Sequence, residues 1–443
     1  MNPLKMIKHL IIGGGIAGIS IAVKLLKRGE SFLLLESSDR LGGKIETKRT
    51  VEACLEMGPS SFTDQSPEIF DLLDALGLKG DVLEPSPAAK NRFILKEGRI
   101  VRLPTAPPEL ITSGALSPWG KIRFLWEAVH VANPTKEEES VWGFFARHFG
   151  REAAEFLADP FVSGVYAGDA RRLSFREAFP SMAEAEARSS SLIRHLFRNR
   201  RSGRVAPKTY QLKGGLGTLV ERASGLLGEE RFHRGEAVRE IVSERGSLTA
   251  VTERDRYLAE TIYLTSPAPA AAKILERHFG ALSRELLRIE YAPLVSIHLR
   301  VSRREKYPFD GFGLLIPSCE QKKILGVLWH SSIFPDLFPD KGHHYLGIYA
   351  GGVRHPEVVE DSEERLRDLV LKEVQRFFSL RVTPEFLHLR RHRQAIPQYQ
   401  LGYGVILQRI REELSRFPSL RLAGNYLEGV SLSKTAAQAM SVV

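Results

Sequence analysis

The chain has 443 residues, of which 43% are hydrophobic and 26% are charged. This length exceeds what a single hydrophobic core usually serves, so we expect two or three domains. The composition excludes fibrous, low-complexity and disordered classes. The formal net charge of +10 favours an anionic partner such as nucleic acid, acidic lipid or an acidic small molecule. The alternative is an enzyme with a slightly basic, solvated surface.

The chain contains two cysteines, Cys54 and Cys319, and neither belongs to a CxxC pair. This excludes zinc ribbons, iron–sulfur clusters and redox dithiols, so no metal site is predicted, and a reducing compartment fits. The apolar stretch at 10–23 lacks the cleavage site of a signal peptide. No apolar run is long enough to cross a bilayer, so any membrane attachment is expected to be peripheral or monotopic.

In chain order, the first unit predicted is a βαβ motif. HLII at 9–12 is a short buried-strand pattern, and SFLLL at 31–35 is a second one. Between them, the turn GGGIAG leads into a helix with apolar residues at helical spacing, which ends at Gly29. This is about the length of a nucleotide-binding unit.

The later segments predict a mixed α/β architecture. A helix is expected at 67–78, a hairpin at 91–104 with its turn at EGR, mainly helices at 105–205 and a strand at 259–267. Further apolar segments predict a mostly antiparallel sheet that is distinct from the first unit, and the chain ends in a strand, a glycine loop and a helix. These sheet segments are LVSIHLRVS, GFGLLIP, ILGVLWHSS and YLGIYAGG.

The turn at 13–18 satisfies G-x-G-x-x-G, a pattern in which glycines permit a tight turn, close backbone approach to a pyrophosphate and close helix packing. Glu36 follows Gly18 by 18 residues at a strand end, where its carboxylate can accept hydrogen bonds from a ribose diol. The motif therefore predicts a dinucleotide site. Its turn residues are Gly13, Gly15, Ile16, Ala17 and Gly18.

The stretch ESSDRLGGK at 36–44 distinguishes a site for FAD from a site for NAD. In an NAD site, the carboxylate that binds the ribose is the last residue that the motif requires. Arg40, Gly42 and Gly43 would then have no role. A flavin dinucleotide is longer, and consecutive glycines let backbone run beside it. Arg40 or Lys44 can offset phosphate charge. The alternative is a Gly-Gly hairpin with a solvated arginine.

Two further glycine segments fit a flavin. EMGPS at 56–60 forms a second glycine loop, and AGNYLEGVSL at 423–432 precedes the last helix, whose N–H groups can stabilise negative charge on the reduced ring. The other residues expected at the cofactor are Ser37, Gly58, Pro59, Ser60, Val238, Gly424, Gly429, Val430 and Ser431.

Together, G-x-G-x-x-G, E-x-x-x-R-x-G-G and the C-terminal glycine motif resemble the FAD-dependent amine oxidase superfamily. Within it, VSGVYAGDARRLSFREAFP at 162–180, GFGLLIP at 311–317 and AIPQY at 395–399 are similar to the protoporphyrinogen oxidase family. The resemblance extends from about residue 8 to 438.

The resemblance implies non-covalent FAD and the six-electron oxidation of a porphyrinogen to a porphyrin in heme synthesis, with oxygen reoxidising the flavin. It implies a cytoplasmic protein attached peripherally to the inner face of the cell membrane, and it is compatible with a homodimer and with handover to ferrochelatase. The implied parts are a p-cresol-methylhydroxylase-like FAD domain (1–80, 206–280 and 386–443), a substrate domain (81–104 and 281–385) and a helical membrane-binding domain (105–205).

The resemblance also assigns substrate residues. Arg92 matches an arginine that binds a substrate carboxylate, and a guanidinium suits that task because it forms two parallel hydrogen bonds. Phe312 and Leu315 match apolar residues that sandwich a pyrrole ring, although core packing would also explain them. Gly164 and Tyr349 match further positions in the substrate pocket. No residue stands out as a general base, since the flavin itself can accept hydride.

Two segments predict contact with a lipid surface. The stretch 188–208 holds seven Lys and Arg residues interleaved with apolar ones and contains no acid. The stretch 109–130 offers Trp119, Phe124 and Trp126 as interfacial anchors. A solvated loop beside a core helix is the alternative for either segment, and no nucleic-acid motif is present.

The chain departs from the family pattern in RHRQAIPQY, which lacks a tryptophan, and in SLSKTAAQAM, which lacks a polar-Asp-Cys run. Three alternatives therefore stay open: coproporphyrinogen III oxidation, an amine oxidase or carotenoid desaturase, and a flavin- or porphyrin-binding protein without turnover. An amine oxidase is disfavoured because a cationic substrate would not suit Arg92.

Overall fold

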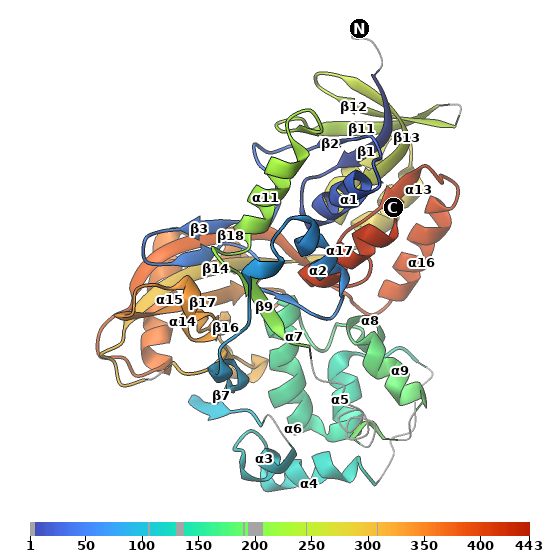
Figure 1. The fold of residues 1–443 in the computed structure, drawn as a ribbon. Helices are drawn as coiled ribbons and strands as arrows, with labels where there is room; N and C mark the ends of the chain where they lie inside the picture. Colours follow the sequence, from blue (N-terminus) through green and yellow to red (C-terminus); the bar gives the residue numbers. More distant parts are fainter. Residues whose placement is uncertain are drawn as a thin grey trace.

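The computed structural model describes residues 5–104, 107–129, 137–188, 191–193, 207–244, 246–307 and 309–443. Two large β-sheets lie beside each other, and a group of helices extends beyond them at the lower end of the view in Figure 1. This arrangement confirms the predicted α/β fold class with several interleaved parts.

The first sheet contains the predicted βαβ unit. Its strand order is β10-β2-β1-β13-β12-β11, and β19 pairs with β13. β1 pairs in parallel with both β2 and β13. The elements are β1 (Lys5–Ile12), α1 (Ile16–Lys27), β2 (Phe32–Leu35), β10 (Phe232–His233), β11 (Val238–Glu244), β12 (Ser247–Thr252), β13 (Arg256–Leu264) and β19 (Leu420–Leu422).

Helices cover both faces of this sheet, which is why β1 and β2 are apolar at successive positions. Leu10 and Ile12 face one hydrophobic core, whereas Ile11 between them faces another, as the two-residue period of a strand requires. The helices of the first core are α12 (Ala268–Leu275), α13 (Gly280–Leu287) and α16 (Tyr403–Leu414), and those of the second are α1, α2 (Glu68–Ala75), α11 (Gly217–Leu227) and α17 (Leu432–Ser441).

The second sheet has the order β18-β14-β17-β16-β15-β7-β8. Its pairs are antiparallel, as predicted, except that β15 pairs in parallel with β7. The predicted hairpin is confirmed, with Glu97 and Gly98 at its turn in left-handed backbone conformations. Its strands are β7 (Arg92–Lys96), β8 (Arg99–Arg102), β14 (Tyr291–Ser302), β15 (Gly313–Leu315), β16 (Ile324–Leu328), β17 (His343–Gly351) and β18 (Glu385–Pro397).

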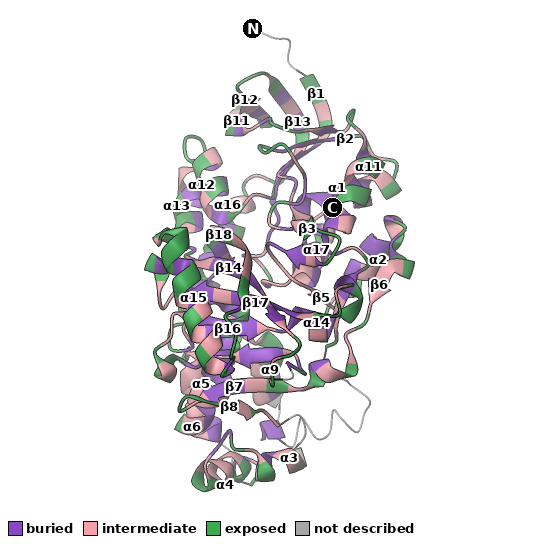
Figure 2. Ribbon diagram, turned by 90° about the vertical axis from the view of Figure 1, so that its left-hand side faces the viewer, coloured by how far each residue is buried: buried purple, intermediate pink, exposed green. Residues whose placement is uncertain are grey.

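One face of this sheet packs on α15 (Glu363–Phe377), whose exposed side is plain in Figure 2. Short strands form two further small sheets: β4 pairs with β3, and β9 pairs with both β5 and β6. These strands are β3 (Thr47–Arg49), β4 (Cys54–Glu56), β5 (Phe62–Thr63), β6 (Val82–Leu83) and β9 (Thr209–Leu212).

The described part of 105–205 is helical, as predicted, and α4 lies at its outer end (Figure 1). Ala154–Ala158 form a π-helical turn directly before α7. Among the described residues, no helix has the length and apolarity needed to traverse a bilayer. The helices are α3 (Pro107–Thr112), α4 (Pro118–Trp126), α5 (Val141–Phe149), α6 (Arg151–Ala153), α7 (Asp159–Tyr166), α8 (Phe175–Ala178) and α9 (Pro180–Arg188).

Candidate active site

The glycine turn leaves an open space in front of the N-terminus of α1. Gly15 is the N-cap residue and provides no side chain to cap the helix, so its first N–H groups point outward. A Cβ atom added at Gly15 would find no atom within 4 Å, whereas one added at Gly18 would lie 1.9 Å from the Gly13 carbonyl oxygen. Gly18 therefore serves packing, and Gly15 borders space that suits a pyrophosphate.

Glu36 lies directly after β2, at the same edge of the sheet. Its carboxylate is buried and accepts hydrogen bonds from the Gly14 amide at 2.6 Å and from the Ser38 amide at 2.8 Å. Ser37 donates to it at 3.2 Å. The amides of 235 and 236 bond to the carbonyls of Ser38 and Glu36, so the start of β11, where Val238 lies, is held at this end of the site.

Arg40 organises its own loop. Its guanidinium donates to the carbonyl oxygens of Leu41 and Ile45 at 3.0 Å and of Gly43 at 2.9 Å. A Cβ atom on Gly43 would lie 3.2 Å from the Gly15 Cα, so the loop packs against the glycine turn. The sequence offered Arg40 or Lys44 to offset phosphate charge, which stays a prediction; in this structure the Arg40 donors also stabilise the loop.

The Lys44 side chain contacts the second sheet. Its ammonium group donates to the Ala395 carbonyl at 2.5 Å and lies 5.5 Å from the Tyr291 ring centroid. Burial lowers the pKa of Lys44 to about 8. A Cβ atom on Gly58 would lie 1.9 Å from the Lys44 carbonyl oxygen, so the loop of Gly58, Pro59 and Ser60 packs directly on Lys44.

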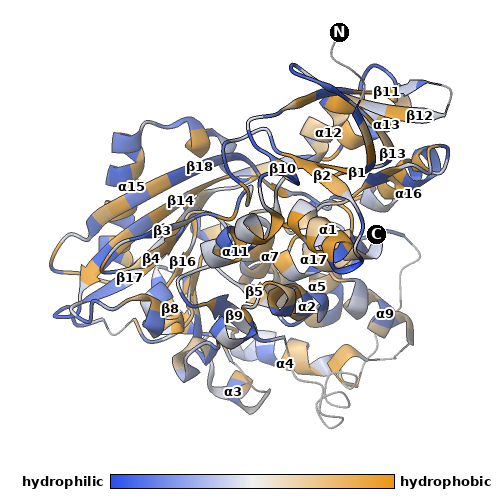
Figure 3. Ribbon diagram, turned by 45° about the horizontal axis from the view of Figure 1, so that its top comes forward, coloured by the Kyte–Doolittle hydropathy of each residue, from blue (hydrophilic) through white to orange (hydrophobic). Residues whose placement is uncertain are grey.

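The last helix begins close to the first one. The Lys24 side chain, late in α1, donates to the carbonyl of Met440, late in α17, so the two packed helices run in the same direction and begin at the same end. Ser431 caps α17 by accepting from the Lys434 amide. Gly429 and Val430 precede this cap, and Gly424 donates to the Gln438 side chain at 3.1 Å. Figure 3 shows both helices side by side.

These elements fit a flavin dinucleotide. Two helix N-termini, a glycine turn beside open space and the Glu36 carboxylate lie at one edge of the first sheet. Helix N-termini attract anionic groups through their free N–H groups and their dipoles. The residues of the glycine turn, 36–44, 58–60 and 424–431 would hold the cofactor, which would accept hydride from the substrate.

The structure brings together the five substrate residues that the sequence predicted. Arg92 pairs with Gly313 in the register of β7 and β15, and its guanidinium lies 4.6 Å from the Phe312 ring centroid. A Cβ atom on Gly164 would lie 2.6 Å from the Leu315 side chain. Gly326 of β16 pairs with both Leu315 and Tyr349, so these residues form one row across the sheet.

Tyr349 joins this row to the loop of Gly58, Pro59 and Ser60, which is named the flavin loop. Burial raises the pKa of Tyr349 to about 12, and its hydroxyl forms a hydrogen bond with Ser60. The hydroxyl therefore stays protonated near neutral pH and can orient groups but cannot act as a base there.

Arg92 has no carboxylate within ion-pair distance among the residues that the structure describes. Lys96, four positions along the same strand, is in contrast paired with Glu152 at 3.0 Å. An unpaired guanidinium stacked on an aromatic ring is arranged to bind an anionic group from outside the protein.

The sequence analysis did not single out the groups that hold the 56–60 loop. The buried Glu56 accepts from the Leu216 amide at 2.8 Å and from Gln211 at 3.1 Å. His298 of β14 bonds to the Glu56 carbonyl at 2.9 Å, and His392 of β18 bonds to the Met57 carbonyl at 2.8 Å. The sequence signal for this arrangement was a glutamate directly before a glycine loop.

Comparison with known proteins shows the family to which the chain belongs. The family model described as flavin containing amine oxidoreductase matches residues 16–439. Protoporphyrinogen oxidase 2 of Arabidopsis thaliana is 31% identical over 464 residues, covering 96% of this chain and 91% of that protein. Coproporphyrinogen III oxidase of Bacillus subtilis is 28% identical and covers 98% of this chain and 97% of that protein.

A solved structure from Exiguobacterium sp. 255-15 shares the fold, with a TM-score of 0.85 at 24% identity, covering 99% of this chain and 97% of that one. Reduced UDP-galactopyranose mutase shares it with a TM-score of 0.73 at 17% identity, covering 98% of this chain and 94% of that one.

Replacing Gly15 tests the pyrophosphate position. Gly15→Val should fold, because Gly15 has extended backbone angles and nothing lies within 4 Å of the added Cβ atom, but it should bind no FAD. Gly18→Val is the matched comparison, and it should instead destabilise the fold. Flavin absorbance of the purified variants measures the first effect and circular dichroism the second. A yellow, fully loaded Gly15→Val protein would show that the phosphates lie elsewhere.

Glu56 should make stability depend on pH. Burial raises its pKa from 4.5 to about 7, so between these values the unfolded chain releases a proton that the folded chain keeps. The free energy of unfolding should therefore fall as pH rises from 4.5 to 7, by at most about 3 kcal/mol.

Glu56→Gln should lack this loss, because its amide oxygen can accept from Leu216 and Gln211 as the carboxyl does but carries no group that ionises. Denaturant unfolding at pH 5 and pH 7.5 should show the variant gaining stability relative to wild type at the higher pH. Glu364→Gln, on the exposed side of α15, is the control. Parallel pH profiles for wild type and Glu56→Gln would contradict a neutral Glu56.

Proposed function

Since the chain belongs to the flavin containing amine oxidoreductase family and, within it, to the protoporphyrinogen oxidases, we propose that it oxidises protoporphyrinogen IX to protoporphyrin IX in heme biosynthesis. Membership makes it an FAD-dependent oxidoreductase. The observation that carries the proposed substrate is the unpaired Arg92 guanidinium at the edge of an apolar group formed by Phe312, Leu315 and Gly164.

A porphyrinogen is a large apolar macrocycle with carboxylate side chains, and this arrangement matches both parts. Arg92 would bind one propionate, and Phe312 and Leu315 would lie against a pyrrole ring. Tyr349 bonds to Ser60 of the flavin loop. It would thereby fix the position of the substrate residues relative to the cofactor residues. The chain's own contribution is thus orientation rather than acid–base chemistry.

The bound FAD would supply the oxidation, and we propose that it is held without a covalent bond. Neither Cys54 nor Cys319 lies in the C-terminal glycine motif. Oxygen is the proposed acceptor that regenerates the cofactor after each two-electron step.

Coproporphyrinogen III is the second candidate substrate, favoured by the similarity to the Bacillus subtilis coproporphyrinogen III oxidase. It carries two more propionates, which would require additional cations near Arg92. The growth of porphyrin fluorescence under air, measured with each porphyrinogen, distinguishes the two candidates. A protein that binds FAD but oxidises neither substrate would refute the proposed reaction.

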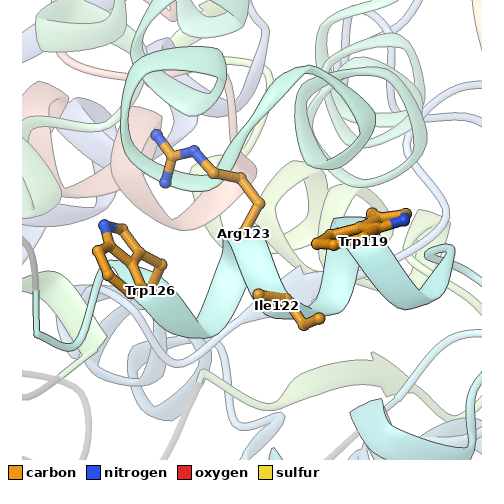
Figure 4. Close-up of a pocket in the computed structure, with 4 residues that line it drawn as sticks. All are labelled: Trp119, Ile122, Arg123 and Trp126. Atoms are coloured by element: carbon orange, nitrogen blue, oxygen red, sulfur yellow. The ribbon is translucent and has the colours of Figure 1, made fainter.

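We further propose that α4 attaches the protein to the inner face of the cell membrane. Trp119, Ile122 and Trp126 are 79%, 55% and 52% exposed, and Figure 4 shows them along one helix. Arg123 points back into the protein and donates to the carbonyls of Arg147 and His148, which fixes α4 on α5. The basic stretch predicted to contact lipid lies largely outside the described residues.

Arg92→Ala should raise KM for protoporphyrinogen about 10- to 100-fold, because a charge-assisted hydrogen bond contributes about 1.5–3 kcal/mol. FAD content should not change. Arg102→Ala is the matched control, since Arg102 lies on the same hairpin opposite Phe93, on the other face of the sheet. Loss of FAD with an unchanged KM would show that Arg92 serves the cofactor instead.

Trp119→Ser combined with Trp126→Ser should release the protein from vesicles that contain acidic lipid, because interfacial tryptophans anchor proteins at the headgroup level. Co-sedimentation with vesicles at physiological salt measures this. Activity in detergent should persist. Leu287→Ser, at an exposed apolar residue of the first sheet's helices, is the control. Unchanged sedimentation of the double variant would exclude α4 as the anchor.

A further inference from the structure

Helix α7 presents an apolar face that includes Gly164. Phe161 and Val165 are 41% and 40% exposed, and their spacing from Gly164 places all three on one side of the helix. Gly164 is in close contact with Leu315 of β15. These residues, Phe161, Gly164, Val165 and Leu315, are called the α7–β15 face below.

The N-terminal end of α7 is tied to the sheet by one side chain. Asp159, the first residue of α7, is buried, and its carboxylate accepts from the Ser318 amide at 2.7 Å. Its other oxygen is bound by the Arg354 guanidinium, whose side chain is 12% exposed. Ser318 follows Leu315 by three residues, so this carboxylate holds the same strand segment that Gly164 contacts.

The C-terminal end of α7 is tied through the carbonyl groups of its last residues. The Ala167 carbonyl accepts from the Val353 amide at 2.8 Å, and the Tyr166 carbonyl accepts from Gln398 at 2.8 Å. A Cβ atom on Gly352 would lie 2.5 Å from the Ala167 carbonyl oxygen, so these segments are in direct contact. Val353 and Arg354 are adjacent in the sequence, so one short segment of the chain contacts both ends of α7.

We infer that Asp159 is a positioning residue that sets the placement of α7 relative to β15 and thereby the shape of the α7–β15 face that receives the macrocycle. The inference rests on the proposed function, because it assigns the face to porphyrinogen binding. At the C-terminal end of α7 the Val353 bond is backbone and the Tyr166 bond comes from the Gln398 side chain, so Asp159 is the side chain whose substitution is expected to release the N-terminal end of α7.

The chemistry of the Asp159–Arg354 ion pair explains why its loss would change substrate binding. Removing one partner of a buried ion pair leaves the other charge without compensation. In Asp159→Asn the shape is kept, but Arg354 loses its counter-charge and is expected to move toward solvent. Ser318 would then lose its strong acceptor, and the segment that carries Leu315 would shift against Gly164.

The test uses the purified, FAD-loaded full chain. Asp159→Asn should raise KM for protoporphyrinogen about tenfold or more, since displacements of about 1 Å can cost up to a hundredfold in rate. Affinity for protoporphyrin IX, measured by fluorescence titration, should fall by a similar factor. FAD content and the flavin spectrum should not change, and hydrogen exchange in 313–320 should become faster.

Arg354→Lys provides a second variant in case Asp159→Asn folds poorly, and it should give smaller shifts in the same direction because it keeps the charge. Glu360→Gln is the matched control, since it removes the exposed Glu360–Arg393 pair and should leave every readout unchanged.

Unchanged KM, porphyrin affinity and hydrogen exchange in Asp159→Asn would overturn the inference. If wild type does not oxidise porphyrinogen at all, the proposed function fails, and hydrogen exchange in 313–320 still decides whether Asp159 holds β15. Faster exchange there would support the positioning role, and unchanged exchange would overturn it.

Discussion

The 56–60 loop is the constraint on which the rest of the structure depends, because the cofactor side and the substrate side meet there. Its carbonyl groups are bonded by His298 and His392 of the second sheet. The Glu56 side chain is bonded by Gln211 and by the Leu216 amide, which come from the segment next to the first sheet. A buried polar group without a partner is costly, so these bonds fix both sheets to one short loop.

The electrostatics around this loop favour neutral groups. Burial raises the pKa of Glu56 to about 7 and lowers that of His298 to about 4, so near neutral pH His298 is uncharged and Glu56 is only partly ionised. Burial thus reduces the charge on the groups through which the loop joins the two sheets. Two cations act on groups of this loop: Arg49 lowers the pKa of Glu56, and Lys44, whose own pKa is lowered to about 8 by burial, acts on His392.

The parts of this molecule that could be predicted from sequence are those set by local geometry. The turn at 13–18, the hairpin at 92–102 and the helix at 68–75 follow from glycine positions and apolar spacing within a few residues. The contacts that build the substrate site are different. Gly164 and Leu315 are 151 positions apart, and no periodicity in the sequence indicates that they touch.

Arg40 and Glu56 show a second limit of prediction from the sequence. The sequence identifies a cation near a phosphate site, but it does not show that the guanidinium will be used by three carbonyl groups of its own loop. Likewise, two partners of Glu56, Gln211 and Leu216, lie more than 150 residues away. Which polar groups form hydrogen bonds with each other depends on the folded chain. The partners of such residues can therefore be identified only after the fold is known.

The absence of a base among the five substrate residues explains why so much of the structure serves placement. Flavin chemistry moves hydride without help from a side chain, so rate depends on how closely the reacting carbon is held to the ring. The chain meets this demand with rigid elements: a glycine against Leu315, a tyrosine bonded to the flavin loop and a buried ion pair at the end of α7. A macrocycle held by one guanidinium can still rotate about that contact, and the neighbouring apolar walls are what restrict this rotation.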